Sequence, residues 1–198
     1  NIFLIMVTNP VDVLTQLAIS LFPEKKNQIM GTGTLLDTMR LQRLLAAELK
    51  VGYKKVEAIM AGEHGNSSVA LWSLTKVAGK KLANYPQINS QVKNRLYAAV
   101  RDMATNIIAG KGATFYGIGA ATAYLIRLLL AGRKTIVPLS HLLVGEHGLT
   151  DVCLGLPVII DRSGVVGRPK LTLTNEEREL LHKSAAQLQE VFKQARTA

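Results

Sequence analysis

An imidazole, a carboxylate and a guanidinium stand close together in the sequence, at His64, Asp37 and Arg40. Oxidation of a secondary alcohol needs a group that accepts the hydroxyl proton, and near neutral pH an imidazole suits this role. A carboxylate fixes the tautomer of such an imidazole, and a guanidinium binds a substrate carboxylate through two parallel hydrogen bonds. Asp37 and Arg40 are three residues apart, so a helix would project both from one face. The pattern predicts proton transfer to or from a hydroxy acid.

Each of these residues also has a purely structural interpretation. Asp37 completes a Thr34-x-x-Asp37 capping box, and its pairing with Arg40 is then a surface ion pair. His64 lies in Gly-Glu-His-Gly, a turn sequence that occurs again around His147. No matching Asp and Arg pair precedes His147, which we interpret as a turn residue. Spacing alone favours the structural interpretation of Asp37, Arg40 and His64.

The hydrophobic pattern predicts a mixed α/β chain in which strands and helices hold these residues. Residues 69–85 are expected to be extended, with a turn at Gly79. A capping pair of Thr174 and Glu177 should start the final helix. Expected strands are 2–7, 56–60, 135–144, 151–160 and one near 170–173, and expected helices are 11–21, 35–49, 92–109, 119–130 and the one after Thr174.

Composition narrows the class of protein. The 198 residues are 48% hydrophobic with a net charge of +10, enough apolar surface for a core. The basic residues are scattered along the chain. The sequence also has no zinc-ligand spacing and no aromatic RNA-binding motif, so we expect no nucleic-acid partner and no metal site. No apolar run reaches the roughly 20 residues that span a membrane. The single Cys153 and the lack of a secretion signal fit a cytoplasmic protein.

Four segments resemble successive motifs of the lactate/malate dehydrogenase family and occur in the family's order. Within the family, residues 31–43 resemble the hydroxyisocaproate dehydrogenases in particular. Residues 111–119 resemble the bacterial lactate dehydrogenases. The four segments are Val7-Thr8-Asn9-Pro10-Val11-Asp12, Gly31-Thr32-Gly33-Thr34-Leu35-Leu36-Asp37-Thr38-Met39-Arg40, Gly62-Glu63-His64-Gly65-Asn66-Ser67 and Lys111-Gly112-Ala113-Thr114-Phe115-Tyr116-Gly117.

The resemblance implies a role for each site residue. His64 would be the proton donor and acceptor, Asp37 its orienting carboxylate, and Arg40 the partner of the substrate carboxylate. Asn9 would touch both the substrate oxygen and the ribose of an NAD cofactor, and Val7 would also contact the cofactor. Thr114 would line the pocket near the substrate side chain, which favours a monocarboxylate such as lactate over malate.

The resemblance further implies two structural units and an incomplete cofactor site. Residues 1–30 would be the remnant of a dinucleotide-binding Rossmann domain, and residues 31–198 the substrate domain, with antiparallel strands and long helices. The expected partners are a 2-hydroxy or 2-oxo acid, an N-terminal NAD-binding half, and further copies of the chain in a dimer or tetramer. The Gly-x-Gly-x-x-Gly fingerprint is absent, because 31–36 carries leucine at its last position.

Two hypotheses remain open. In the first, the chain is part of an active L-2-hydroxyacid dehydrogenase, acting on lactate and pyruvate or a longer analogue, with malate as an alternative substrate. In the second, it is a truncated, non-catalytic interaction module. The first residues read as a buried strand without a preceding turn, so we expect a segment upstream. We also expect the chain to be inactive by itself.

Overall fold

The structure is a computed structural model that describes residues 2–197. Its main layer is a mixed five-stranded sheet in the order β1-β2-β8-β9-β10. β1 and β2 pair in parallel, and the other three neighbouring pairs are antiparallel. The strands are Leu4–Met6 (β1), Ile29–Gly31 (β2), Thr135–Val144 (β8), Thr150–Asp161 (β9) and Gly164–Gly167 (β10).

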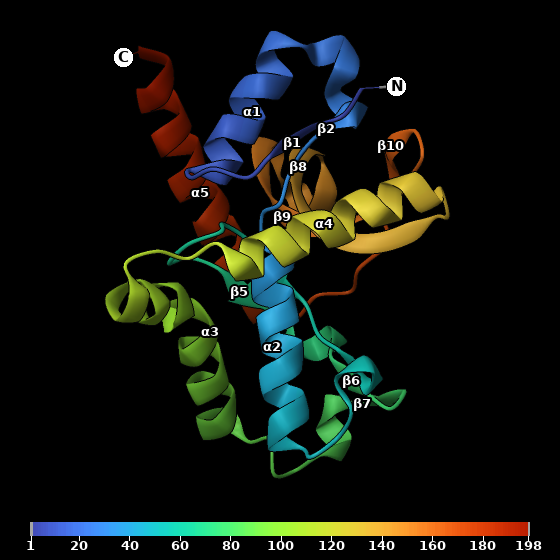
Figure 1. Cartoon of the computed structure of the whole chain (residues 1–198), viewed down its shortest axis with the longest axis vertical. Coiled ribbons are helices and arrows are strands. Elements are labelled where there is room, and N and C mark those ends of the chain that lie inside the picture. Colours follow the sequence, from blue (N-terminus) through green and yellow to red (C-terminus); the bar gives the residue numbers. More distant parts are fainter. Residues whose placement is uncertain (1, 198) are drawn as a thin grey trace.

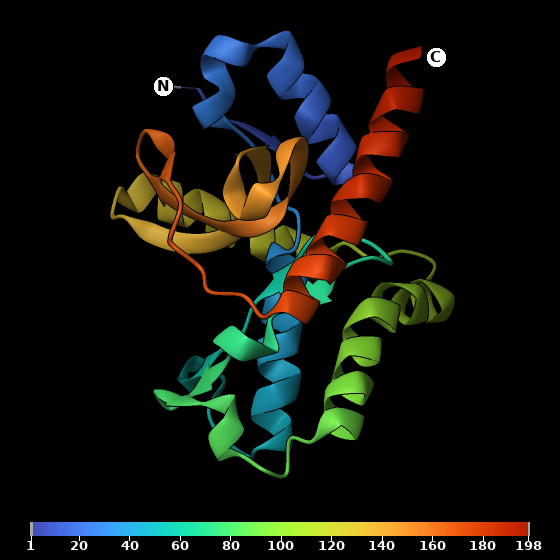
Figure 2. The same cartoon turned by 180° about the vertical axis from the view of Figure 1, so that it is seen from behind.

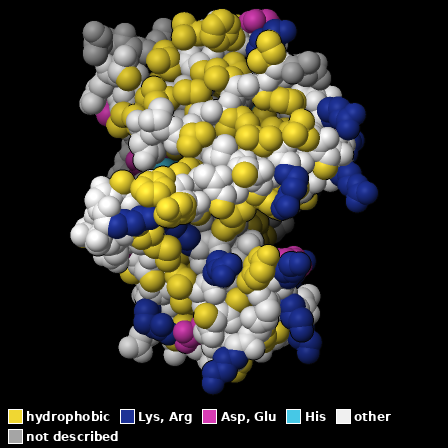
Figure 3. All heavy atoms as spheres, in the orientation of Figure 1, with side chains coloured by type: hydrophobic (Ala, Val, Ile, Leu, Met, Phe, Trp, Pro, Cys, Tyr) yellow, Lys and Arg dark blue, Asp and Glu magenta, His cyan; other side chains and the backbone are white. Residues whose placement is uncertain are grey.

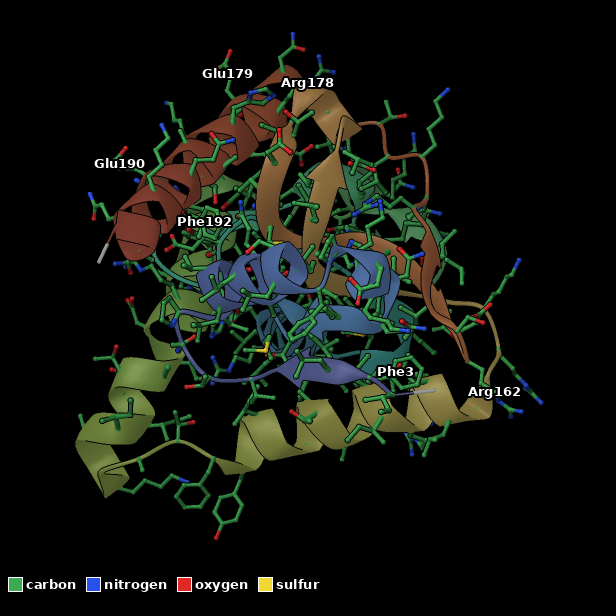
Figure 4. All side chains as sticks on the ribbon, turned by 90° about the horizontal axis from the view of Figure 1, so that it is seen from above. Phe3, Arg162, Arg178, Glu179, Glu190 and Phe192 are labelled. Atoms are coloured by element: carbon green, nitrogen blue, oxygen red, sulfur yellow. The ribbon has the colours of Figure 1, made fainter. Side chains whose placement is uncertain are left out.

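Helices cover both faces of this sheet (Figures 1 and 2). Alternate residues of β1 show the division, because Met6 packs with the cluster of α1 (Val11–Leu21) and Ile5 with that of α4 (Tyr116–Ala131). Seen from above, Phe3, just before β1, lies beside α4 (Figure 4). The last helix, α5 (Asn175–Thr197), runs beside α1 and packs against the first half of β9.

A second part of the molecule extends away from the sheet around α2 (Leu35–Glu48) and α3 (Ser90–Lys111) (Figure 1). Leu41 and Leu45 of α2 pack with Leu96 of α3 in a separate buried cluster. Short strands close this cluster. They are Val56–Glu57 (β3), Met60–Ala61 (β4), Val69–Ala70 (β5), Lys76–Val77 (β6) and Lys80–Lys81 (β7).

Within residues 2–197, five short 3₁₀ helices link these elements, and the chain turns at Gly79, where φ is +77°, as expected. The 3₁₀ helices are Pro23–Gln28, Tyr53–Lys55, Trp72–Leu74, Leu82–Asn84 and Glu146–Gly148.

The expected strand near 170–173 is wrong, because residues 168–173 form no strand. The strand of this region is β10, which begins at Gly164 directly after a tight turn. The Asp161 carboxylate accepts a hydrogen bond from the Ser163 N–H at 2.7 Å, and Gly164 adopts a φ of +107°. Val165 can therefore pair with β9 at once. The expected strand over 56–60 is also interrupted, forming β3 and β4 with a break between them.

The fold class is confirmed as α/β, with a mixed sheet and long helices. Among residues 2–197 we find no helix with the length and apolar content needed to cross a membrane.

Candidate active site

The loop that carries His64 is attached to the centre of the sheet. Gly62 and Gly155 of β9 exchange two backbone hydrogen bonds, of 2.8 and 2.9 Å. Gly62 has a φ of +81°, and a Cβ there would lie 2.8 Å from the Ser184 hydroxyl oxygen. Because only glycine tolerates both conditions, the first glycine of Gly-Glu-His-Gly lets the loop approach α5. The two hydrogen bonds to Gly155 therefore fix the position of Glu63 and His64, which follow Gly62.

A second attachment joins the start of this loop to α2. The Thr38 hydroxyl oxygen accepts a hydrogen bond of 2.9 Å from the Met60 N–H. Thr38 follows Asp37 on α2, and Met60 belongs to the strand that leads to His64. This hydrogen bond therefore holds α2, which carries Asp37, next to the strand that leads to His64.

His64 and Asp37 meet directly. The Nδ1 atom of His64 lies 2.6 Å from Oδ2 of Asp37, and their side chains are 25% and 10% exposed. Because Asp37 occupies Nδ1, Nε2 is the ring atom left for a reacting group. The arrangement suits an imidazole that transfers a proton at Nε2 while a carboxylate holds its orientation.

Arg40 completes the group from the same helix face. Its Nη1 lies 3.4 Å from Oδ1 of Asp37, and the residue is 9% exposed. A guanidinium has five N–H donors, and this is the one hydrogen bond or ion pair that Arg40 makes within residues 2–197. The remaining donors are therefore available to an anionic group.

The structural interpretation of Asp37 and Arg40 is wrong for this chain. Both residues are buried, so their pair is not a surface ion pair. Thr34 stands at the N-terminus of α2 with φ −86° and ψ 14°, and its side chain makes no capping bond. An N-cap needs an extended backbone, which Thr34 lacks, and Asp37 is bound to His64 instead.

The electrostatics of the pair favour a charged imidazole. The hydrogen bond that His64 donates to Asp37 is the largest influence and raises the pKa of His64, against the opposing effect of burial. The charges of Asp37 and Asp12 also raise this pKa, while Arg40 lowers it. His64 therefore keeps its proton to a higher pH than a free histidine does.

Residues that the sequence did not single out also hold the loop. The Asp12 carboxylate accepts a 2.8 Å hydrogen bond from the His64 peptide N–H, and the Ser184 hydroxyl oxygen accepts one of 2.8 Å from the Glu63 N–H. Oε2 of Glu63 lies 2.5 Å from the hydroxyl of Ser67, across the turn. Asp12 had one sequence signal, an acidic residue between Val11 and Val13, but acids are common in the first turn of exposed helices as well.

The other expected site residues are not in contact with the His64 and Asp37 pair. Val7 and Asn9 are exposed just after β1, and no hydrogen bond within residues 2–197 engages the Asn9 side chain. Thr114 is partly buried in the segment between α3 and α4 and makes no hydrogen bond to the pair in the described chain.

The second Gly-Glu-His-Gly differs from the first. His147 has a φ of +55° inside a short turn between β8 and β9, and its carbonyl oxygen contacts the His182 ring nitrogen at 2.9 Å. Burial lowers the pKa of His147. It is a turn residue, as the sequence indicated. No group of three metal-ligating side chains occurs within the described range.

Comparison with known proteins gives one family. Residues 34–198 match the family described as lactate/malate dehydrogenase, alpha/beta C-terminal domain. The L-lactate dehydrogenase of Acetivibrio thermocellus is 38% identical over 195 residues, which cover 96% of this chain and 62% of that protein. That of Lactobacillus helveticus is 39% identical over 198 residues, with 98% and 61% covered.

A solved structure shows the same fold. The minor L-lactate dehydrogenase from Enterococcus mundtii, in its ligand-bound form, has a TM-score of 0.94 and 34% identity, covering 97% of this chain and 62% of that one. The chain thus spans about three fifths of the length of these relatives. With its family match, its fold and its motifs in agreement, the chain belongs to the lactate/malate dehydrogenase family.

Proposed function

We propose that the chain is the substrate-binding part of an NAD-dependent L-2-hydroxyacid dehydrogenase that interconverts lactate and pyruvate. The observation that carries this proposal is the 2.6 Å contact between His64 and Asp37, beside the buried Arg40, in a chain of this family. When bound, NAD accepts or supplies the hydride. In the direction of reduction, protonated His64 gives the Nε2 proton to the substrate carbonyl oxygen as the hydride reaches the carbonyl carbon, which leaves a hydroxy acid and a neutral imidazole.

Asp37 and Arg40 have separate roles in this proposal. Asp37 holds the imidazole through Nδ1 and stabilises its protonated form. Arg40 presents its unused N–H donors to the substrate carboxylate, which fixes the substrate relative to His64. Both side chains are buried, and charge-assisted hydrogen bonds are stronger where water is excluded.

The exposed residues after β1 would hold the cofactor and the substrate oxygen. The Asn9 amide and the Val7 backbone lie at the carboxyl end of a strand that pairs in parallel, where α/β sheets bind ligands. Thr114 would border the substrate side chain. Residues 1–30, with this parallel pair, would be the end of a dinucleotide-binding domain, and residues 31–198 the substrate domain.

We infer lactate rather than malate as the substrate. The relatives described above are named L-lactate dehydrogenase, and Thr114 fits a monocarboxylate. A longer 2-hydroxy acid is the second candidate, because 31–43 resembles hydroxyisocaproate dehydrogenases. We place the enzyme in the cytoplasm, where the buried thiol of Cys153 would stay reduced.

We also propose that the chain forms a homo-oligomer, a dimer or tetramer, that contributes to glycolytic lactate formation. Large apolar side chains are exposed on α4 and the start of β8, with Tyr116 at 76%, Leu130 at 68% and Ile136 at 58%. Hydrophobic side chains also gather on this face of the molecule (Figure 3). Exposed apolar patches of this kind are typical of subunit interfaces.

The full-length enzyme tests the proposed function. Pyruvate, oxaloacetate and 2-ketoisocaproate are compared as substrates with NADH, and we expect pyruvate to give the highest kcat/KM. Because His64→Asn removes the proton donor, it should lower kcat by on the order of 100-fold or more. NADH binding should be retained. His147→Asn, in the second Gly-Glu-His-Gly, is the matched control and should leave turnover unchanged. A parent enzyme that reduces none of the three acids would favour the non-catalytic module.

A further inference from the structure

A carboxylate that the proposed reaction does not yet use lies behind the His64 loop. Asp12 is in the first turn of α1 and is 2% exposed. Its Oδ2 accepts the peptide N–H of His64 at 2.8 Å, and its Oδ1 is buried without a hydrogen-bond partner in the part of the chain that the structure describes. Burying a carboxyl group with an unpaired oxygen costs stability. A neutral side chain of this size would avoid part of that cost.

The groups that face Asp12 come from three other elements. The Ser140 side chain of β8 and the peptide and ring of His64 lower the pKa of Asp12, and Glu63 raises it. Burial is the largest influence, and it raises the pKa of Asp12 to about 6. The thiol of Cys153 on β9 is also near, and it remains protonated because burial raises its pKa further. Asp12 therefore changes charge near pH 6, where an ordinary aspartate would already be ionised.

We propose that Asp12 is a positioning residue for His64, which it holds by the peptide N–H and supports with a second negative charge beside the imidazole. The inference rests on the proposed function, since it concerns the proton that His64 would transfer. Asp37 acts on the ring through Nδ1, whereas Asp12 acts from the opposite end of the same residue, through its backbone. The two carboxylates thus fix both the position of the loop and the orientation of the ring.

The charge of Asp12 has a defined consequence for pH dependence. Ionised Asp12 raises the pKa of His64, as Asp37 does, while Arg40 lowers it. Above pH 6 Asp12 is mostly ionised, and it helps His64 to keep the proton that carbonyl reduction consumes. Below pH 6 Asp12 loses its charge, but His64 is then protonated without its help. The Asp12 carboxylate therefore extends the alkaline limit of reduction.

Asp12→Asn separates charge from position. The amide keeps an oxygen that can accept the His64 N–H, but it removes the negative charge. In the full-length enzyme, an NMR titration of labelled histidine should show the pKa of His64 lowered by at least about 0.5, a threefold change in proton affinity. The alkaline midpoint of kcat/KM for pyruvate should fall by the same amount, while KM at low pH stays near that of the parent.

Asp12→Ala removes the acceptor as well, and Asp102→Asn is the control for loss of one charge from an exposed site on α3. We expect Asp12→Ala to lower kcat by about tenfold or more even at low pH. At the same pH, Asp12→Asn should keep most of the parent kcat, and Asp102→Asn should match the parent. Should Asp12→Ala fail to fold, Asp12→Asn alone decides. An unchanged pKa of His64 in Asp12→Asn overturns the inference. Because the titration needs no turnover, an inactive parent would count against the proposed function only.

Discussion

At the scale of single residues, the candidate site is a histidine between two carboxylates. Spacing in the sequence, with the resemblance, was enough to name His64, Asp37 and Arg40, and the structure brings the three together. Asp12 lies in the first of the four segments that carry the resemblance, but nothing in the local sequence indicates a role for it. An acid in the first turn of a helix is usually exposed, and its burial follows from the crossing of α1 over β8, which no local pattern encodes.

Asp37→Asn should shift the pH dependence of His64 in one direction. The Asp37 hydrogen bond raises the pKa of His64, so its removal lowers this pKa and weakens proton donation. We expect kcat for pyruvate reduction to fall by on the order of 100-fold, with the alkaline midpoint moved to lower pH. The check is a pH profile of the full-length variant together with an NMR titration of His64.

The same change affects stability with a definite sign. Because the folded pKa of His64 is raised, the pair contributes stability that is fully present below about pH 6.5, the ordinary histidine value, and is lost as pH rises through the folded pKa. The difference in unfolding free energy between the parent and Asp37→Asn should shrink as the solution becomes alkaline. Glu24→Gln, which changes an exposed acid, is the control. If the alkaline midpoint of kcat for pyruvate reduction does not move in Asp37→Asn, the role of Asp37 is contradicted.

At the scale of elements, the long ones followed from the sequence. The helix over 11–21 and the strand over 135–144 have the expected bounds, because apolar periodicity over ten or more residues identifies them. The elements of residues 56–85 could not be predicted from the sequence, because the strands there have two residues each and alternate with 3₁₀ turns. The strand near 170–173 failed because Leu171 and Leu173 pack into a core cluster without pairing, so hydrophobicity there reports burial rather than a sheet.

The capping pair at the start of α5 is a prediction that the structure confirms and extends. The Glu177 carboxylate accepts the Thr174 N–H at 3.0 Å, and the Thr174 hydroxyl oxygen accepts the Glu177 N–H at 3.2 Å. Glu177 also accepts the N–H of Ser73 at 2.9 Å and contacts its hydroxyl. One buried side chain therefore caps α5 and anchors a distant turn.

Glu177→Ala should destabilise the fold by about 2–3 kcal/mol, since it removes a helix cap and leaves the Ser73 N–H without an acceptor. Glu176→Ala changes the neighbouring acid of the same first turn, which is exposed, and should cost only about 0.3–1 kcal/mol through the helix dipole. Urea denaturation of the two variants measures the difference. Equal losses would mean that the buried network adds nothing to a simple charge effect.

At the scale of the whole molecule, the chain spans about three fifths of the length of its relatives. The near match to a nucleotide-binding fingerprint at 31–36 is packed inside the fold. A Cβ on Gly31 would meet the Thr15 side chain, and one on Gly33 would lie 2.6 Å from the Ser140 backbone nitrogen. These glycines serve the crossing of α1 and β8 and leave no space for a phosphate.

The 198-residue chain alone should therefore bind NADH weakly and show little or no turnover. Fluorescence titration of NADH with the isolated chain tests this, and pyruvate reduction is measured alongside. The full-length enzyme is the positive control, with clear enhancement expected. Strong NADH binding by the isolated chain would show that its own residues suffice for the cofactor.

The attachments of the His64 loop also determine when it can form during synthesis. One anchor comes from Asp12 in α1 and the other from Ser184 in α5, so the loop joins residues near both ends of the chain. On the ribosome, α1 emerges before α2 and α3, and α5 emerges after them. Until residue 184 has left the exit tunnel, the peptide around His64 lacks one of its two acceptors. A nascent chain would thus acquire its core around α2 and α3 first, and the geometry of the imidazole would be among the last features to become native.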